Sequence, residues 1–118
     1  MNCFFDEKGS PKAKLIVKGE HEEVEIEALI DTGFSGDLTL PLPEAIFLKL
    51  RLVSSVAIVL ADGSIKNKLM FEGKSKLDKK FVSTDIILTE EGDAKVGIAL
   101  LKRNRLTIDF AKDKISIK

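Results

Sequence analysis

The chain has 118 residues, a length typical of one domain, and 44% of them are hydrophobic, which excludes a disordered chain and is enough for a core. Nineteen basic and nineteen acidic residues cancel, so the net charge gives no reason to expect nucleic acid or an anionic membrane as a partner. A single domain over residues 1–118 is predicted.

The small number of cysteine and histidine residues limits the kinds of catalytic and metal site that the chain can form. Cys3 is the one cysteine, which excludes an internal disulfide framework and a multi-cysteine metal site. His21 is the one histidine and lies in the charged turn "GEHEE", where a solvated side chain is expected rather than a catalytic or metal-binding one. We therefore expect no metal and no cofactor. The start of the chain lacks the pattern of a signal peptide and no apolar run is long enough to span a membrane, so a cytoplasmic protein is expected.

The first half of the chain is predicted to form short strands and one helix. Val24, Ile26 and Ala28 alternate with glutamates, which is the period of a half-buried strand. Pro43 stands where a helix accepts proline, in its first turn. The predicted elements are strands over 12–19, 23–30 and 37–41 and a helix over 43–50.

The second half continues with strands and turn signals. Asp62-Gly63 separates two strand-like segments and favours a type I′ hairpin turn. Gly97 precedes a short run with helical spacing, and Lys112-Asp113 marks a late turn. The predicted strands cover 54–61, 64–73, 79–90, 105–111 and 114–118. About seven short strands with turns at roughly ten-residue spacing predict an all-β fold, a small barrel or sandwich.

Three features, in this order and spacing, resemble the retropepsin-like (retroviral-type) aspartic proteases, above all their small prokaryotic and cellular members. The first is "ALIDTG", a hydrophobic strand that runs into Asp31-Thr32-Gly33. The second is the hairpin with Gly63 at its tip, where the family has its flap. The third is "VGIALLKRNRLTIDF", a strand ending in glycine, a short helix and another strand. The resemblance covers about residues 12–118 and implies a small closed β-barrel of retropepsin-like type.

The chemistry of this motif implies a dimer. Metal-free hydrolysis of a peptide needs a base for the water and an acid for the carbonyl oxygen, and two adjacent carboxylates that share a proton supply both. Asp62, Asp85 and Asp109 lack the motif, so the second carboxylate is expected from Asp31 of a second copy. The resemblance thus implies a homodimeric aspartic endopeptidase with a peptide or protein substrate.

The resemblance also implies roles for individual residues. Besides Asp31, the expected catalytic residues are Thr32, which would hydrogen-bond across the two-fold axis, and Gly33, which lets the backbone approach the carboxylate. Val96 and Gly97 are expected near the site, where the glycine would let the neighbouring loop pack beneath it. An extended peptide would bind by strand pairing. The expected substrate-binding residues are Phe34, Ser35, Asp62, Gly63 and Ser64.

Some positions depart from the family pattern. Phe34 stands where retroviral enzymes have a small residue, and Ser35 and Ile98 replace the partners of their aspartate–arginine pair. Because both partners are lost together, neither charge is left alone. Lys95 and Val96 replace a pair of aliphatic residues before the late glycine. The segments "MNCFF" and "KISIK" are candidate interface strands.

Simpler interpretations of the same residues stay open. Asp31-Thr32-Gly33 is also typical of an Asx turn in which Asp31 caps its own backbone and Gly33 supplies a positive φ. Asp62-Gly63 is also the signal of a plain hairpin. The alternative function is a catalytically silent module of the same fold that binds a peptide or partner by strand addition. The intact motif favours the enzyme, whereas Phe34 and the missing ion pair favour the module.

Overall fold

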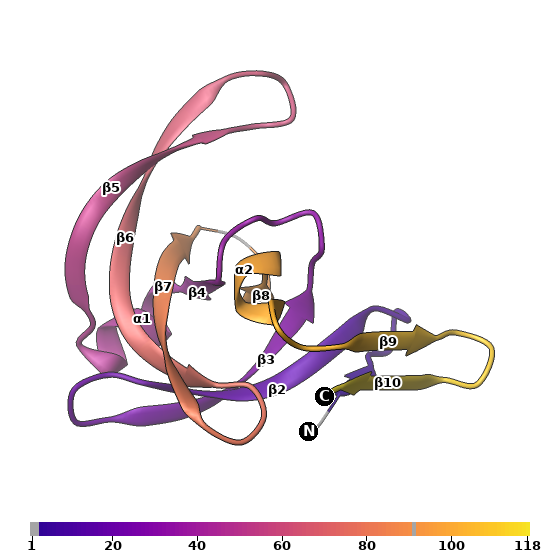
Figure 1. Ribbon diagram of the computed structural model, residues 1–118. Coiled ribbons are helices and arrows are strands. Elements are labelled where there is room, and N and C mark those ends of the chain that lie inside the picture. The colour runs from indigo at the N-terminus through magenta and orange to yellow at the C-terminus, as the bar shows by residue number, and fades with distance from the viewer. Residues whose placement is uncertain (1–2, 91) are drawn as a thin grey trace.

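The computed structural model describes residues 3–90 and 92–118, which form strands and two short helices (Figure 1). The strands are β1 (Cys3–Phe5), β2 (Pro11–Lys18), β3 (Glu23–Ile30), β4 (Leu38–Pro41), β5 (Arg51–Val59), β6 (Ile65–Lys76), β7 (Phe81–Thr89), β8 (Lys95–Val96), β9 (Leu106–Asp109) and β10 (Lys114–Ile117), and the helices are α1 (Leu42–Leu48) and α2 (Ile98–Leu101). The predicted all-β class is confirmed. Neither helix, in the described part of the chain, is long and apolar enough to cross a membrane.

The strands bond into a closed ring, as the predicted barrel requires. The large sheet has the order β1-β2-β3-β8-β4-β7-β6-β5, and a further pairing of β2 with β6 joins its two sides. That closure runs antiparallel from Ile16 opposite Lys76 to Lys18 opposite Lys74. β8 pairs in parallel with β3 and antiparallel with β4, so the segment around Val96 lies between the strands on either side of the Asp31 turn.

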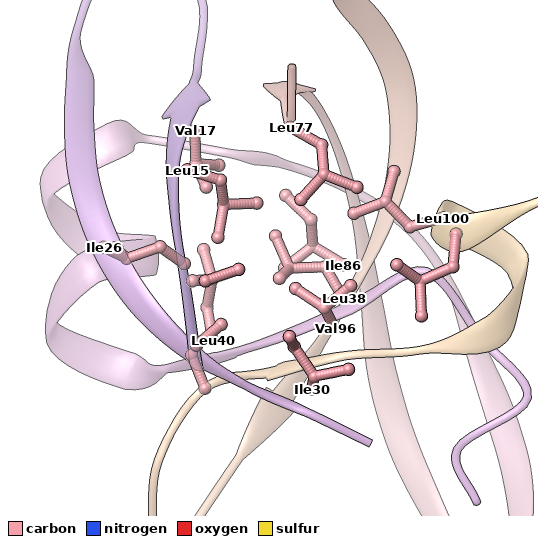
Figure 2. Close-up of a cluster of buried hydrophobic side chains, with 14 of the residues drawn as sticks. Leu15, Val17, Ile26, Ile30, Leu38, Leu40, Leu77, Ile86, Val96 and Leu100 are labelled. Atoms are coloured by element: carbon pink, nitrogen blue, oxygen red, sulfur yellow. The ribbon is translucent and has the colours of Figure 1, made fainter. Parts of the chain in front are cut away.

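Alternating apolar side chains fill the ring (Figure 2). In β2, Leu15 and Val17 are buried because they lie two residues apart and therefore on one face of the strand. Leu38, Ile86 and Val96 are fully buried and come from three different strands. Each strand thus contributes one face to a shared hydrophobic core, which sets its register because a one-residue slip would expose that face.

Helix α1 differs slightly from its prediction. Pro43 lies in its first turn, as expected, but the helix ends at Leu48 because Lys49 adopts the left-handed conformation with φ 51°. The Lys49 N–H donates to the Ile46 carbonyl oxygen at 3.1 Å, which closes the last turn. The helix leads directly into β5, which begins earlier than predicted.

The hairpin of β5 and β6 projects beyond the ring, on the side away from β9 and β10 (Figure 1). The prediction of a type I′ turn is wrong. The Leu60 N–H donates to Ser64 O at 2.8 Å, the Gly63 N–H donates to Leu60 O at 2.9 Å, and φ is positive at Gly63 (84°) but not at Asp62. This is the three-residue loop with a terminal left-handed glycine, which "DG" serves equally well.

The candidate interface strands contact each other within the chain. β1 pairs with β2, β10 pairs with β9, and β1 lies against β10. The rings of Phe5 and Phe110 are 5.4 Å apart at their centroids. Residues 1–2 lie outside the described residues, and a contact of these strands with a second copy stays a prediction.

Candidate active site

Asp31 begins the turn that follows β3, and both its backbone and its carboxylate form hydrogen bonds. Its N–H donates to Val96 O at 2.9 Å, which anchors the start of the turn to β8. Its Oδ1 accepts the Gly33 N–H at 2.9 Å, and its carbonyl accepts the Phe34 N–H at 3.1 Å. An Asx turn is therefore present. The positive φ expected of Gly33 in that interpretation is wrong.

The glycine at position 33 matters for space instead. A Cβ there would lie 3.2 Å from Asp31 Oδ1, tighter than an ordinary van der Waals contact. Glycine therefore lets the backbone N–H reach the carboxylate without a methyl group in the way. The hydrogen bond fixes Oδ1 and leaves Oδ2 turned to the other side.

The second carboxylate oxygen faces a cation. Asp31 Oδ2 lies 4.0 Å from Lys95 Nζ, at the outer limit of an ion pair, and both side chains remain partly exposed. Lys95 comes from β8, where Leu29 lies opposite it. From the sequence, Lys95 was only a departure from the family pattern, and its contact with Asp31 was not predicted.

Both residues line an open cleft of about 670 Å³ between the ring and the β5–β6 hairpin. The floor is formed by the turn around Asp31, one wall by β5 and the other by the end of β7. Two lysines, Lys68 and Lys95, bring positive charge to it. The lining residues are Asp31, Gly33, Phe34, Ser35, Gly36, Thr39, Val56, Ala57, Ile58, Val59, Lys68, Ile87, Leu88, Thr89 and Lys95.

The loop after Asp31 is clamped to the start of α2. The N–H groups of Gly97, Ile98 and Ala99 donate to the carbonyl oxygens of Asp37, Phe34 and Gly36 at 2.9, 2.8 and 3.1 Å. A Cβ at Gly97 would overlap the Gly36 carbonyl oxygen and the Phe34 ring. The approach of these two segments thus depends on the missing side chain at Gly97.

The structure brings some of the expected site residues together and separates others. Phe34 and Ser35 line the cleft beside Asp31, and the Phe34 ring is half-buried against Gly97. Thr32 is exposed at the apex of the turn and is not among the residues that line the cleft. Val96 is fully buried beneath the site.

The hairpin tip lies apart from this group. Asp62, Gly63 and Ser64 are exposed and do not line the cleft, whose wall is formed by β5 residues nearer the ring. Asp62 Oδ1 accepts the Ser64 hydroxyl at 2.6 Å and the Ser64 N–H at 2.9 Å, and these bonds lower the pKa of the Asp62 carboxyl. The Asp62 carboxylate thus stabilises the tip of the hairpin.

Asp37 is a further residue that the sequence did not single out. Its Oδ2 accepts the Asp85 N–H at 2.8 Å, which ties the loop after Asp31 to β7. Partial burial raises the pKa of the Asp37 carboxyl above its ordinary value of 3.8, and the nearby Asp85 adds to that rise. Its carboxylate therefore positions the loop rather than serving as a second catalytic group.

Asp37→Asn is expected to change the pH dependence of stability. A raised pKa means that the folded protein holds this proton more tightly, so ionisation above about pH 4 disfavours the folded state. Asparagine keeps an oxygen for the Asp85 N–H without the charge. Relative to the parent, the variant should gain stability from pH 4 to pH 7, by under about 1 kcal/mol because solvent screens the group. Urea unfolding followed by circular dichroism suits a chain without Trp or Tyr, and a relative loss over that range would contradict the assignment.

No group of three or more potential metal ligands occurs among the described residues. Cys3 is partly buried, and burial raises the pKa of its thiol. Cys3 does not line the cleft, so it adds no reactive group there. The charged pair at the cleft floor is Asp31 and Lys95.

No protein-family model matches the sequence, and no curated protein does. Solved structures do match. A retropepsin-like aspartic protease from Rickettsia conorii has a TM-score of 0.69 at 21% identity, over 98% of this chain and 86% of that one. The EIAV protease in complex with the inhibitor HBY-793 has a TM-score of 0.60 at 17% identity, over 83% of this chain and 90% of that one.

A third similar structure is the retroviral protease-like domain of Ddi1 from Leishmania major. Its TM-score is 0.52 at 14% identity, over 91% of this chain and 88% of that domain. Because these identities are low, the likeness concerns the course of the backbone. The chain has the retropepsin-like fold.

Proposed function

We propose that the protein is an aspartic endopeptidase that hydrolyses peptide bonds as a homodimer. The observation that carries the proposal is the placement of Asp31. Its carboxylate lies at the floor of an open cleft, with Oδ1 held by the Gly33 N–H and Oδ2 turned away from that bond. The retropepsin-like fold supports this interpretation, since one similar solved structure is a retropepsin-like aspartic protease and another is the EIAV protease with an inhibitor.

The proposed mechanism needs two copies of Asp31. One carboxylate removes a proton from the attacking water while the other, protonated, donates to the carbonyl oxygen of the scissile bond. Neither Asp37 nor Asp62 lines the cleft, so neither supplies the second group. A two-fold axis next to Asp31 brings the second carboxylate from the partner.

The proposed substrate is an extended peptide. β5 is the last strand of the large sheet, with β6 as its partner there, and β5 residues form a wall of the cleft. A strand at the end of a sheet can add a peptide through main-chain hydrogen bonds. Exposed Val59 and Ile65 stand next to the loop at the hairpin tip and offer apolar contact to such a peptide.

Solution mass and inhibition test the proposal together. Light scattering over a concentration series should give a dimer of about twice 13.0 kDa. Peptidase activity should appear over the same concentration range, should be blocked by statin-type transition-state mimics and should be unaffected by chelators. Inhibition by a chelator would contradict the mechanism. A protein that binds an extended peptide as a monomer without cleaving it would be the binding module instead.

A further inference from the structure

Lys95 is placed in the cleft by the alternation of β8. Val96, its neighbour, points into the core and is fully buried, so Lys95 lies on the opposite face of the strand. The Lys95 N–H donates to Thr39 Oγ1 at 2.9 Å, and Leu29 lies opposite it on β3. The backbone is thus held on both sides, while the side chain reaches into the cleft and is 43% exposed.

The charge of Lys95 is only loosely balanced. Its ammonium group lies 4.0 Å from Asp31 Oδ2, too far for a short charge-assisted hydrogen bond. The other lysine of the cleft, Lys68, lies 3.8 Å from Glu90, and its side chain is only 17% exposed, much less than that of Lys95. Lys95 is therefore the cation at the cleft floor that a ligand can still engage.

If two Asp31 carboxylates form a catalytic pair, positive charge exceeds negative charge at the cleft floor. Two Asp31 carboxylates that share one proton carry about one negative charge, whereas the two Lys95 side chains carry about two positive charges. Covering a lysine with an apolar substrate side chain would desolvate the ammonium without giving it a partner. A carboxylate from the substrate would restore the balance and accept its N–H groups.

We propose that Lys95 makes the protein select peptides with a glutamate or aspartate next to the cleaved bond. The proposal rests on the proposed function, because it assumes that Asp31 lies at the scissile carbonyl. A group 4.0 Å from the Asp31 carboxylate lies next to that bond, so the side chains that flank the bond are within its reach. Lys95 is thus a specificity-determining residue, and acidic peptides are the substrate class.

Matched peptides test this selection. Cleavage of a peptide library, read by mass spectrometry, first locates the sites that the parent cuts. Synthetic peptides around one such site then carry Glu, Gln or Leu at the flanking position. The parent should prefer Glu over Gln by at least about tenfold in kcat/KM. Lys95→Met should reduce this ratio to within about twofold, and Lys95→Glu should lower it below one, because the new carboxylate repels the Glu peptide.

Lys79→Met is the matched control, since it makes the same change on an exposed residue between β6 and β7 that does not line the cleft. Its ratio of Glu to Gln should equal that of the parent. A parent with no acidic preference, or a Lys95→Met variant that keeps it, overturns the inference. The same holds if Lys95→Met speeds cleavage of all three peptides alike, because Lys95 would then act on Asp31 and not on the substrate.

A binding measurement separates the inference from the proposed function. Peptides with a hydroxyethylene group in place of the scissile amide cannot be cleaved, and calorimetry compares their Glu and Gln forms. If no peptide is cleaved but the parent still binds the Glu form at least about tenfold more tightly than the Gln form, and Lys95→Met does not, the endopeptidase proposal fails and the acidic selection stands. If the parent binds the Glu form and the Gln form equally tightly, the acidic selection fails.

Discussion

Asp31→Asn should abolish peptide hydrolysis while leaving the fold intact. The amide oxygen of asparagine still accepts the Gly33 N–H, so the turn after β3 keeps its hydrogen bond. The contact with Lys95 is partly exposed, and its loss should cost under about 1 kcal/mol of unfolding free energy. Without a base for the water and a proton for the carbonyl oxygen, kcat/KM should fall at least about 10³-fold.

The matched control is Asp78→Asn, the same change on an exposed residue of the turn between β6 and β7. It should cleave peptides as the parent does. Both variants should unfold within a few degrees of the parent, as measured by circular dichroism. An Asp31→Asn protein that cleaves at the parent rate would show that Asp31 is not catalytic.

Mixing the parent with Asp31→Asn distinguishes a shared site from two separate ones. If each dimer needs both carboxylates, random exchange of an equal mixture leaves only parent–parent pairs active. The mixture should then have about a quarter of the activity of the same total amount of parent. About half of that activity would indicate that each subunit works alone and would remove the shared pair from the mechanism.

Gly97→Ala should be strongly destabilising although alanine suits the backbone conformation there, with φ −101°. The added Cβ would overlap the Gly36 carbonyl oxygen and the Phe34 ring. Neither segment can yield easily, because hydrogen bonds from the start of α2 hold the loop. We expect a cost of about 3 kcal/mol, a large fraction of a typical folding free energy, and a melting temperature lower by roughly 10 °C.

Gly9→Ala separates this overlap from a general effect of replacing glycine. Gly9 has a positive φ of 82°, but a Cβ there would meet nothing within 4 Å. Its cost should come from the backbone alone, about 1 kcal/mol. A Gly97→Ala protein that is as stable as Gly9→Ala would show that the loop after Asp31 can move away from α2. In that case Gly97 would not position the site.

The strands and the turn at Asp31 were predictable because their signals are local. Alternation of apolar residues depends on the two-residue period of a strand, and the Asx turn depends on groups two residues apart. The hairpin tip shows the limit of local signals. Asp62-Gly63 serves a two-residue and a three-residue loop alike, and the pairing of Val59 with Ile65 selects the longer one.

The helix end at Lys49 is a second feature that local signals do not determine. Nothing in its residue type demands a left-handed conformation, and the chain adopts it where α1 must turn into β5. Propensity is a weak prior at such junctions, because the direction of the next strand decides the backbone there. The element was therefore predicted correctly while its boundary was not.

By itself, the sequence determined the all-β class, the core faces of the strands and a carboxylate presented by a glycine turn, because each depends on neighbours along the chain. Only the tertiary structure decided what surrounds that carboxylate. Lys95 meets Asp31 because β8 inserts beside β3, and Asp37 reaches Asp85 because β4 pairs with β7. These contacts join residues far apart in sequence, and closure of the strand ring brings them together.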